Sequence, residues 1–275
     1  MARIGFMQGR LSPQVDGKIQ AFPWNHWRDE FPLAQAAGFG LMEWTLDTER
    51  LYENPLMTEP GRAEIARLQS KHGVAIESLT GDFFMQAPFH KSAGGARERG
   101  LRDLRAVCEA CSQLGIRMLV IPLVDAGRIE TPAEEADVLR TLNGLERSGV
   151  SIVFESDYQP AALARFIAQL DPTFGINYDI GNSASLGYNP VEEIGAFGAR
   201  IRNVHIKDRV RGGTTVPLGT GNANFPAAFG ALSRARYAGN FILQTARAAD
   251  GEHRAALERY RGMAERWIAE ARRAA

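Results

Sequence analysis

Four short segments in the second half of the chain carry residue types that can hold a metal ion and move a proton. They read FESD, YDIGN, HIKD and FILQ, and each continues an apolar run. Two carboxylates and an imidazole around one point suit a divalent metal such as Mn²⁺, Mg²⁺, Co²⁺ or Zn²⁺. For any one residue, a hydrogen bond within a polar pocket is the alternative. The candidate metal ligands are Glu155, Asp179, His205 and Gln244.

A repeated phrase along the chain supplies the elements that must bring these residues together. A helical segment, a Gly turn and a short apolar run recur in AAGFGLMEW, KHGVAIESL, QLGIRMLVIP and RSGVSIVFES. Gly is typical of helix C-termini, and apolar runs of about five residues are typical of strands buried on both faces of a parallel sheet. The predicted strands are Arg3–Met7, Leu41–Trp44, Val74–Leu79, Met118–Pro122, Ser151–Glu155, Gly175–Asp179, Asn203–Lys207 and Asn240–Gln244.

Eight strands alternating with helices over this length predict an α/β protein with a (β/α)8 TIM barrel. The competing doubly wound sheet would carry a Gly-rich turn after an early strand, and the first turn, MQGRLSPQVDGK, lacks that fingerprint. No linker or break in composition interrupts the chain, so we expect residues 1–275 to form a single barrel domain. Active sites of such barrels lie where the strands end.

Further polar side chains follow the other strand ends and are candidates for substrate contacts. Gln8 follows the first strand, Glu43 lies in the second, and His90 lies beyond the third. Lys207 shares a side with His205, because strand residues alternate. The loop FPWNHW places Trp24 where an aromatic wall can stack on a sugar ring, with packing as the alternative.

The loop after the seventh strand, DRVRGGTTVPLGTGNANF, indicates an anion site. It carries Arg209 and Arg211, and a helix is predicted to start near Asn224. Loops after the seventh and eighth strands of barrels often hold phosphate with the help of helix N-terminal amides. A sugar phosphate is one expectation; a packed loop with solvated arginines is the other.

Composition excludes several classes of protein. Lys plus Arg and Asp plus Glu both number 32, so no basic excess indicates a nucleic-acid partner. No signal peptide or membrane-spanning run is recognisable, so we expect a cytoplasmic protein with no membrane association. The C-x-x-C of Cys108 and Cys111 falls late in a predicted helix and indicates two half-buried cysteines rather than a redox motif.

The motifs FESD, YDIGN, NVHIKDR and FILQTAR, in this order, resemble those of the xylose isomerase-like barrel superfamily, as does GFGLMEW with its Glu43. The resemblance runs from about Arg3 to Glu270. The superfamily includes sugar and sugar-phosphate isomerases, 3-epimerases, inosose dehydratases and endonuclease IV. Its motifs do not specify a substrate.

The resemblance implies that Glu155, Asp179, His205 and position 244 bind the metal. The family usually has Glu at the last position, and its epimerases use two metal-bound glutamates to remove and return a proton. Gln244 can offer an amide oxygen but cannot accept a proton near neutral pH. Asn182 stands where family epimerases often carry a His that contacts substrate oxygens. Lys207 resembles the lysine beside the metal, either stabilising an enediolate or pairing with a carboxylate.

These observations lead to a metal-dependent isomerase or epimerase of a small sugar or sugar phosphate. Glu155 is the expected base next to the substrate carbonyl, and Lys207 or a water on the metal is expected to return the proton. Gln244 keeps two alternatives open, namely a dehydratase or lyase with one base and a catalytically reduced sugar-binding barrel. A nuclease like endonuclease IV needs many histidines at the strand ends, and only His205 and at most His90 are placed there. The oligomeric state is left open, with a homo-oligomer as one outcome.

Overall fold

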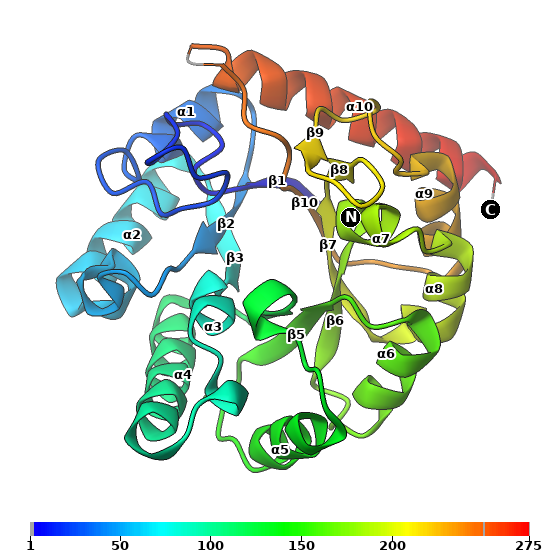
Figure 1. Cartoon of the computed structure of the whole chain (residues 1–275). Helices are drawn as coiled ribbons and strands as arrows, with labels where there is room; N and C mark the ends of the chain where they lie inside the picture. Colours follow the sequence, from blue (N-terminus) through cyan, green and yellow to red (C-terminus); the bar gives the residue numbers. More distant parts are fainter. Residues whose placement is uncertain (1–2, 250, 275) are drawn as a thin grey trace.

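The computed structural model describes residues 3–249 and 251–274, and its centre is a closed parallel barrel. Neighbouring strands follow the order β1-β10-β7-β6-β5-β4-β3-β2 (Figure 1). The predicted (β/α)8 fold is confirmed, and all eight predicted strands lie within two residues of the observed ones. The barrel strands are β1 (Ile4–Met7), β2 (Leu41–Thr45), β3 (Ala75–Thr80), β4 (Met118–Leu123), β5 (Ser151–Ser156), β6 (Gly175–Asp179), β7 (Ile201–Ile206) and β10 (Asn240–Leu243).

Helices surround the barrel, and several start or end at the residues that the sequence marks. Gly73 and Gly115 end two of the helices in the left-handed conformation, at φ 67° and 81°. The helices are α1 (Glu30–Ala36), α2 (Glu59–His72), α3 (Asp82–Gln86), α4 (Gly94–Leu114), α5 (Pro132–Asn143), α6 (Pro160–Ala168), α7 (Ile180–Leu186), α8 (Pro190–Phe197), α9 (Phe225–Arg234) and α10 (His253–Ala274). None of the described helices is long and apolar enough to cross a membrane.

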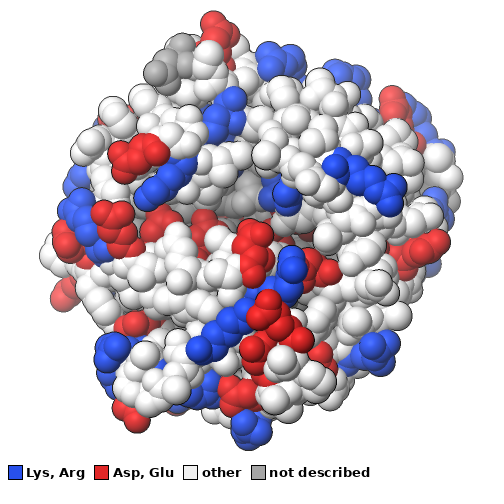
Figure 2. All heavy atoms as spheres, in the orientation of Figure 1, with Lys and Arg blue, Asp and Glu red and all other residues white. Residues whose placement is uncertain are grey.

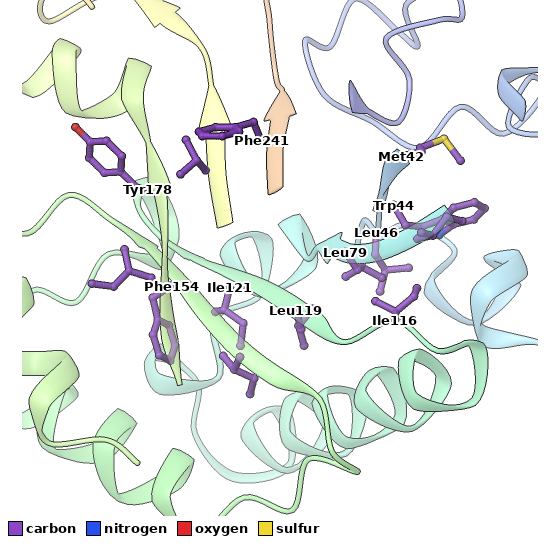
Figure 3. Packing of buried hydrophobic residues seen from close by; sticks show 14 of the residues in the cluster. Met42, Trp44, Leu46, Leu79, Ile116, Leu119, Ile121, Phe154, Tyr178 and Phe241 are labelled. Carbon is purple, nitrogen blue, oxygen red and sulfur yellow. The ribbon is translucent and has the colours of Figure 1, made fainter. Parts of the chain in front are cut away.

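The main hydrophobic core lies between the strands and the helices. It includes Trp44 of β2, Phe154 of β5 and Phe241 of β10, all buried (Figure 3). Cys108 and Cys111 of α4 belong to this core as free thiols, so they are more deeply buried than the sequence predicts. Because alternate strand residues point outwards into this core, the residues between them point into the barrel.

The barrel interior changes from apolar to polar along its axis. Leu41 and Ile242 belong to a small inner apolar cluster. Two residues further along the chain lie Glu43, in the middle of β2, and Gln244, just after β10. The polar layer therefore lies at the C-terminal ends of the strands.

The loop after β7 folds into a short hairpin beside the barrel mouth. Strand β8 (Asp208–Arg209) pairs antiparallel with β9 (Thr215–Val216). The Asp208 carboxylate is fully buried and accepts hydrogen bonds from the backbone N–H groups of Gly219, Gly221 and Ala223. A single buried carboxylate thus holds the end of this loop against β7.

Candidate metal centre and active site

Three of the four predicted metal ligands meet at the mouth of the barrel. Each of Glu155, Asp179 and His205 offers one ligand atom, and these atoms lie within 4.8 Å of one another. Glu155 is next to last in β5, while Asp179 ends β6 and stands opposite His205 of β7 in the strand register. All three side chains are buried. Three adjacent strands therefore present the group at one depth.

The His205 ring is held in one orientation by carboxylates on both sides. Its Nε2 lies 2.7 Å from Glu43 Oε1, and its Nδ1 lies 3.3 Å from Glu155 Oε2. Burial alone would lower the pKa of His205, but these two carboxylates raise it to about 10. The histidine is therefore an imidazolium when these groups face only one another, and Nδ1 is the nitrogen turned toward Glu155 and Asp179.

Glu43 lies beneath the cluster, and both of its oxygens accept hydrogen bonds. The donors are Ser78 Oγ at 2.5 Å, Thr80 Oγ1 at 2.6 Å and Asn203 Nδ2 at 2.8 Å, in addition to the histidine. Although burial raises the pKa of Glu43, His205 and the hydrogen bonds bring it below its ordinary value. Glu43 is fully buried and contacts His205.

Lys207 bridges two of the predicted ligands, Asp179 and Gln244. Its Nζ lies 2.6 Å from Asp179 Oδ2 and donates a 3.0 Å hydrogen bond to Gln244 Oε1. Burial raises the pKa of Asp179 despite this ammonium. The other oxygen of Asp179 accepts from the backbone N–H of Asn182 at 2.8 Å and so caps α7. The start of α7 can approach β7 this closely because residue 181 is Gly: a Cβ there would lie 2.8 Å from Lys207 Cγ.

Two amide side chains orient the Glu155 carboxylate. Asn177 Nδ2 donates to Oε2 at 3.0 Å, and Asn182 Nδ2 donates to Oε1 at 2.5 Å. Asn182 Oδ1 in turn accepts from Arg209 Nη1 at 2.8 Å, while Nε and Nη2 of Arg209 both donate to Gly213 O. Burial favours protonation of Glu155, but the His205 hydrogen bond and the Lys207 charge lower its pKa. The carboxylate is held ionised and in a fixed direction.

The remaining predicted contacts lie farther out. Gln8 is buried, with Oε1 accepting from the Thr45 N–H at 3.1 Å. Trp24 is half-buried, with the Arg50 guanidinium 4.0 Å from the centre of its ring. No hydrogen bond or ion pair among the described residues joins His90 to the cluster; it packs against Phe89. Arg211 is exposed, and its backbone N–H donates to Asn222.

Several residues of the mouth were missed by sequence reasoning. Asn177 and Asn203 stand two residues before Asp179 and His205, so strand alternation alone could have placed them inside the barrel. Asp82, the first residue of α3, carries a pKa raised to about 7 by burial and by the charges of Asp47 and Glu155. The sequence places Asp82 just after the third predicted strand, but the charges that raise its pKa come from other parts of the chain.

The donor set fits a divalent cation. Carboxylate oxygens and an imidazole nitrogen are ligands for Zn²⁺ and Mn²⁺, and the hydrogen bond from the opposite ring nitrogen to Glu43 is the kind of outer contact that orients a metal-binding histidine. A (β/α)8 barrel with such a group of possible ligands at its mouth is typical of metal-dependent enzymes. Figure 2 shows that this face is hollowed near its centre, with acidic and basic side chains around the hollow.

The chain belongs to the xylose isomerase-like TIM barrel family, whose model matches residues 31–267. A curated relative, the L-ribulose-5-phosphate 3-epimerase UlaE of Salmonella paratyphi A, is 24% identical over 231 residues, which cover 79% of this chain and 81% of that protein. A solved L-ribulose 3-epimerase is 19% identical with a TM-score of 0.75, covering 99% of this chain and 96% of that one. The IOLI protein, solved with a bound zinc atom, is 17% identical with a TM-score of 0.72 and 98% coverage of both chains.

Proposed function

We propose that this protein is a metal-dependent epimerase or isomerase of a ketose or ketose phosphate, acting by proton removal next to a carbonyl. The observation that carries the proposal is the Glu155 carboxylate, oriented by Asn177 and Asn182 beside the Asp179–His205 pair. The L-ribulose-5-phosphate 3-epimerase relative supports the reaction class.

Glu155, Asp179 and His205 would hold the metal, with the Gln244 amide as a fourth donor. When bound, a divalent metal supplies Lewis-acid polarisation of the substrate carbonyl. The Glu155 carboxylate takes the proton from the neighbouring carbon, because its lowered pKa keeps it ionised. Lys207 places a positive charge 2.6 Å from Asp179, where it would stabilise the enediolate, and its ammonium, which donates to Gln244 Oε1, would return a proton.

Gln244 favours one alternative reaction. The amide cannot act as the second carboxylate of a symmetric two-glutamate epimerase. A dehydratase or lyase needs one base and so fits this site as the second candidate, while a sugar-binding barrel with reduced catalysis is the third. Among the outer residues, Gln8, Trp24, Arg211 and His90 stay proposed substrate contacts, and Glu43 is proposed to position His205.

The metal's identity (Mn, Mg, Co or Zn), the homo-oligomeric state and the cytoplasmic location stay predictions. A single experiment tests the reaction class. The metal-loaded protein is incubated in heavy water with ketoses, ketose phosphates and inososes, and deuterium uptake next to the carbonyl is followed by mass spectrometry. Uptake that requires the metal supports the proposal whatever the net product. Stoichiometric metal without any uptake contradicts enolisation, and absence of metal after loading favours the sugar-binding barrel.

A further inference from the structure

Arg10 carries a buried guanidinium without a paired anion, at the end of β1. Its side chain is 5% exposed, and its Nε donates to Thr245 O at 2.8 Å. Among the described residues, Nη1 has no hydrogen-bond partner and no carboxylate forms an ion pair with this arginine. Burying a charge is costly unless it is paired. Within the described part of the chain, Nη1 is therefore a buried donor that still needs an acceptor.

The carboxylate that could have served Arg10 is already used. Glu30 accepts from the backbone N–H groups of Gly9 and Leu11 and from Ser12 Oγ. A second guanidinium, that of Arg247, holds the same turn through the carbonyls of Gly9 and Ser12. Burial and the Arg247 charge lower the pKa of Arg10 to about 9. The charges of Glu30 and Asp82 act on this pKa in the opposite direction.

A second donor without a partner stands beside this arginine in the sequence. The Nε2 of Gln8 is buried and has no hydrogen-bond partner within the described part of the chain. Its orientation is fixed, because Oε1 accepts from the N–H and the hydroxyl of Thr45. A buried donor left unpaired costs about 1–3 kcal/mol. Two such donors, Gln8 Nε2 and Arg10 Nη1, lie two residues apart and indicate a binding site for a ligand oxygen.

The turn faces the reacting group across the mouth. In the closed strand order, β1 and β5 are four steps apart, so they stand on opposite sides of the barrel. Asp82 interacts electrostatically with Arg10 and also with Glu155 and Lys207, so these groups border the same mouth. A substrate with its reacting carbon at Glu155 would extend its far end toward β1.

We propose that Arg10 and Gln8 bind an oxyanion at the far end of the substrate, so that the enzyme acts on an anionic ketose, either a ketose phosphate or a keto sugar acid. This inference rests on the proposed function for the substrate's reacting end. It assigns anion recognition to the first strand, whereas the sequence pointed to Arg209, whose guanidinium is occupied by Gly213 and Asn182.

Binding of inorganic phosphate tests the oxyanion site without any turnover. Isothermal titration calorimetry is run on the metal-loaded wild type, Arg10→Met, Gln8→Glu and Arg165→Met, the last a control at an exposed arginine of α6. Gln8→Glu keeps the oxygen that Thr45 contacts and replaces the donor with a negative charge. We expect wild type and Arg165→Met to bind phosphate and both mouth variants to lose at least tenfold in affinity. No binding to the wild type, or equal binding by Gln8→Glu, would overturn the proposal.

Turnover then separates the two anions. In the deuterium-exchange assay, kcat/KM is compared for a neutral ketose, its phosphate and the corresponding keto acid. We expect the wild type to prefer one anionic substrate by about 100-fold and Gln8→Glu to lose that preference, mainly through KM. Equal use of neutral and anionic ketoses by the wild type contradicts the site. If no ketose exchanges, the proposed function fails, while the calorimetry still decides whether the oxyanion site exists.

Discussion

The two sides of the barrel mouth differ in how their buried charged side chains are paired. On the β5–β7 side, carboxylates alternate with cations and amides: Glu155 with Asn177, and Asp179 with Lys207. On the β1 edge, Arg10 is buried without an ion pair in the described structure. The first side is organised before a ligand arrives; the second leaves donors unused. In the proposed mechanism, proton removal and anion recognition therefore lie on different strands.

The β5–β7 side also explains how a buried carboxylate stays ionised. Burial acts against the charge of Glu155, yet its pKa is lowered because His205, Lys207 and Asn177 all stabilise the anion. Fixed dipoles and charges that need no rearrangement during the reaction are the usual source of electrostatic catalysis. At the β1 edge, Arg10 Nη1 and Gln8 Nε2 have no hydrogen-bond partner among the described residues, so these donors are satisfied only when a ligand binds.

Glu155→Gln is expected to show the largest effect on the organised side. The amide keeps the shape but cannot take a proton, so deuterium exchange under saturating metal should fall by about 10³-fold. The melting temperature should stay near that of wild type. Glu192→Gln, a change at an exposed glutamate, is the matched control. If Glu155→Gln stays active, Glu155 is not the base, and the contrast between the two sides of the mouth no longer holds.

Glu43→Gln tests whether the layer beneath the cluster orients the metal site. Its carboxylate accepts from four side chains, including His205. In the variant, the amide NH₂ group would face another hydrogen-bond donor, which costs about 1–3 kcal/mol. Loss of the contact between Glu43 and His205 should weaken metal binding about 10- to 100-fold. Calorimetric metal titration measures the affinity. Ser78→Ala, which removes only one of the donors, should have a clearly smaller effect; an equal effect would point to general loosening instead.

The apparent affinity for the metal should rise about tenfold for each pH unit. Because the carboxylates raise the pKa of His205 to about 10, a proton must leave Nδ1 before a metal can bind there. Apparent metal affinity should therefore rise with pH from about 6 to 9. In the metal-free protein the sign is opposite. The raised pKa stabilises the fold fully below the ordinary value of 6.5, and this contribution is lost as the pH rises toward 10. A metal affinity independent of pH would exclude His205 as a ligand.

The sequence could predict those parts of this site that follow from periodicity. Strand alternation and the order of motifs place Glu155, Asp179 and His205 at one end of the barrel, and in the structure they lie together. The partners of Glu43 and Arg209 could not be predicted in the same way. Glu43 meets Asn203 across 160 positions, and Arg209 meets Asn182 because a loop curls back onto α7. Such contacts depend on closure of the barrel and on loop conformation, which no local pattern encodes.

Arg209→Met is expected to have the smallest effect on activity. It tests whether Arg209 positions Asn182 or binds the anion. If Arg209 positions Asn182, and through it Glu155, its loss should lower kcat about fivefold on every substrate and leave metal affinity unchanged. Asn182→Ala should lower kcat by a similar factor, and the double variant should be no worse than the more impaired single one, since both act on one chain of hydrogen bonds.

The opposite outcome for Arg209→Met has an equally definite meaning. A KM raised only for ketose phosphates, with neutral ketoses unaffected, would make Arg209 the anion contact that the loop sequence suggested. Anion recognition would then lie on the same side as the base, next to Glu155 instead of opposite it. The unused donors of Arg10 and Gln8 would need another ligand, and additive loss in the Arg209→Met/Asn182→Ala double variant would accompany that result.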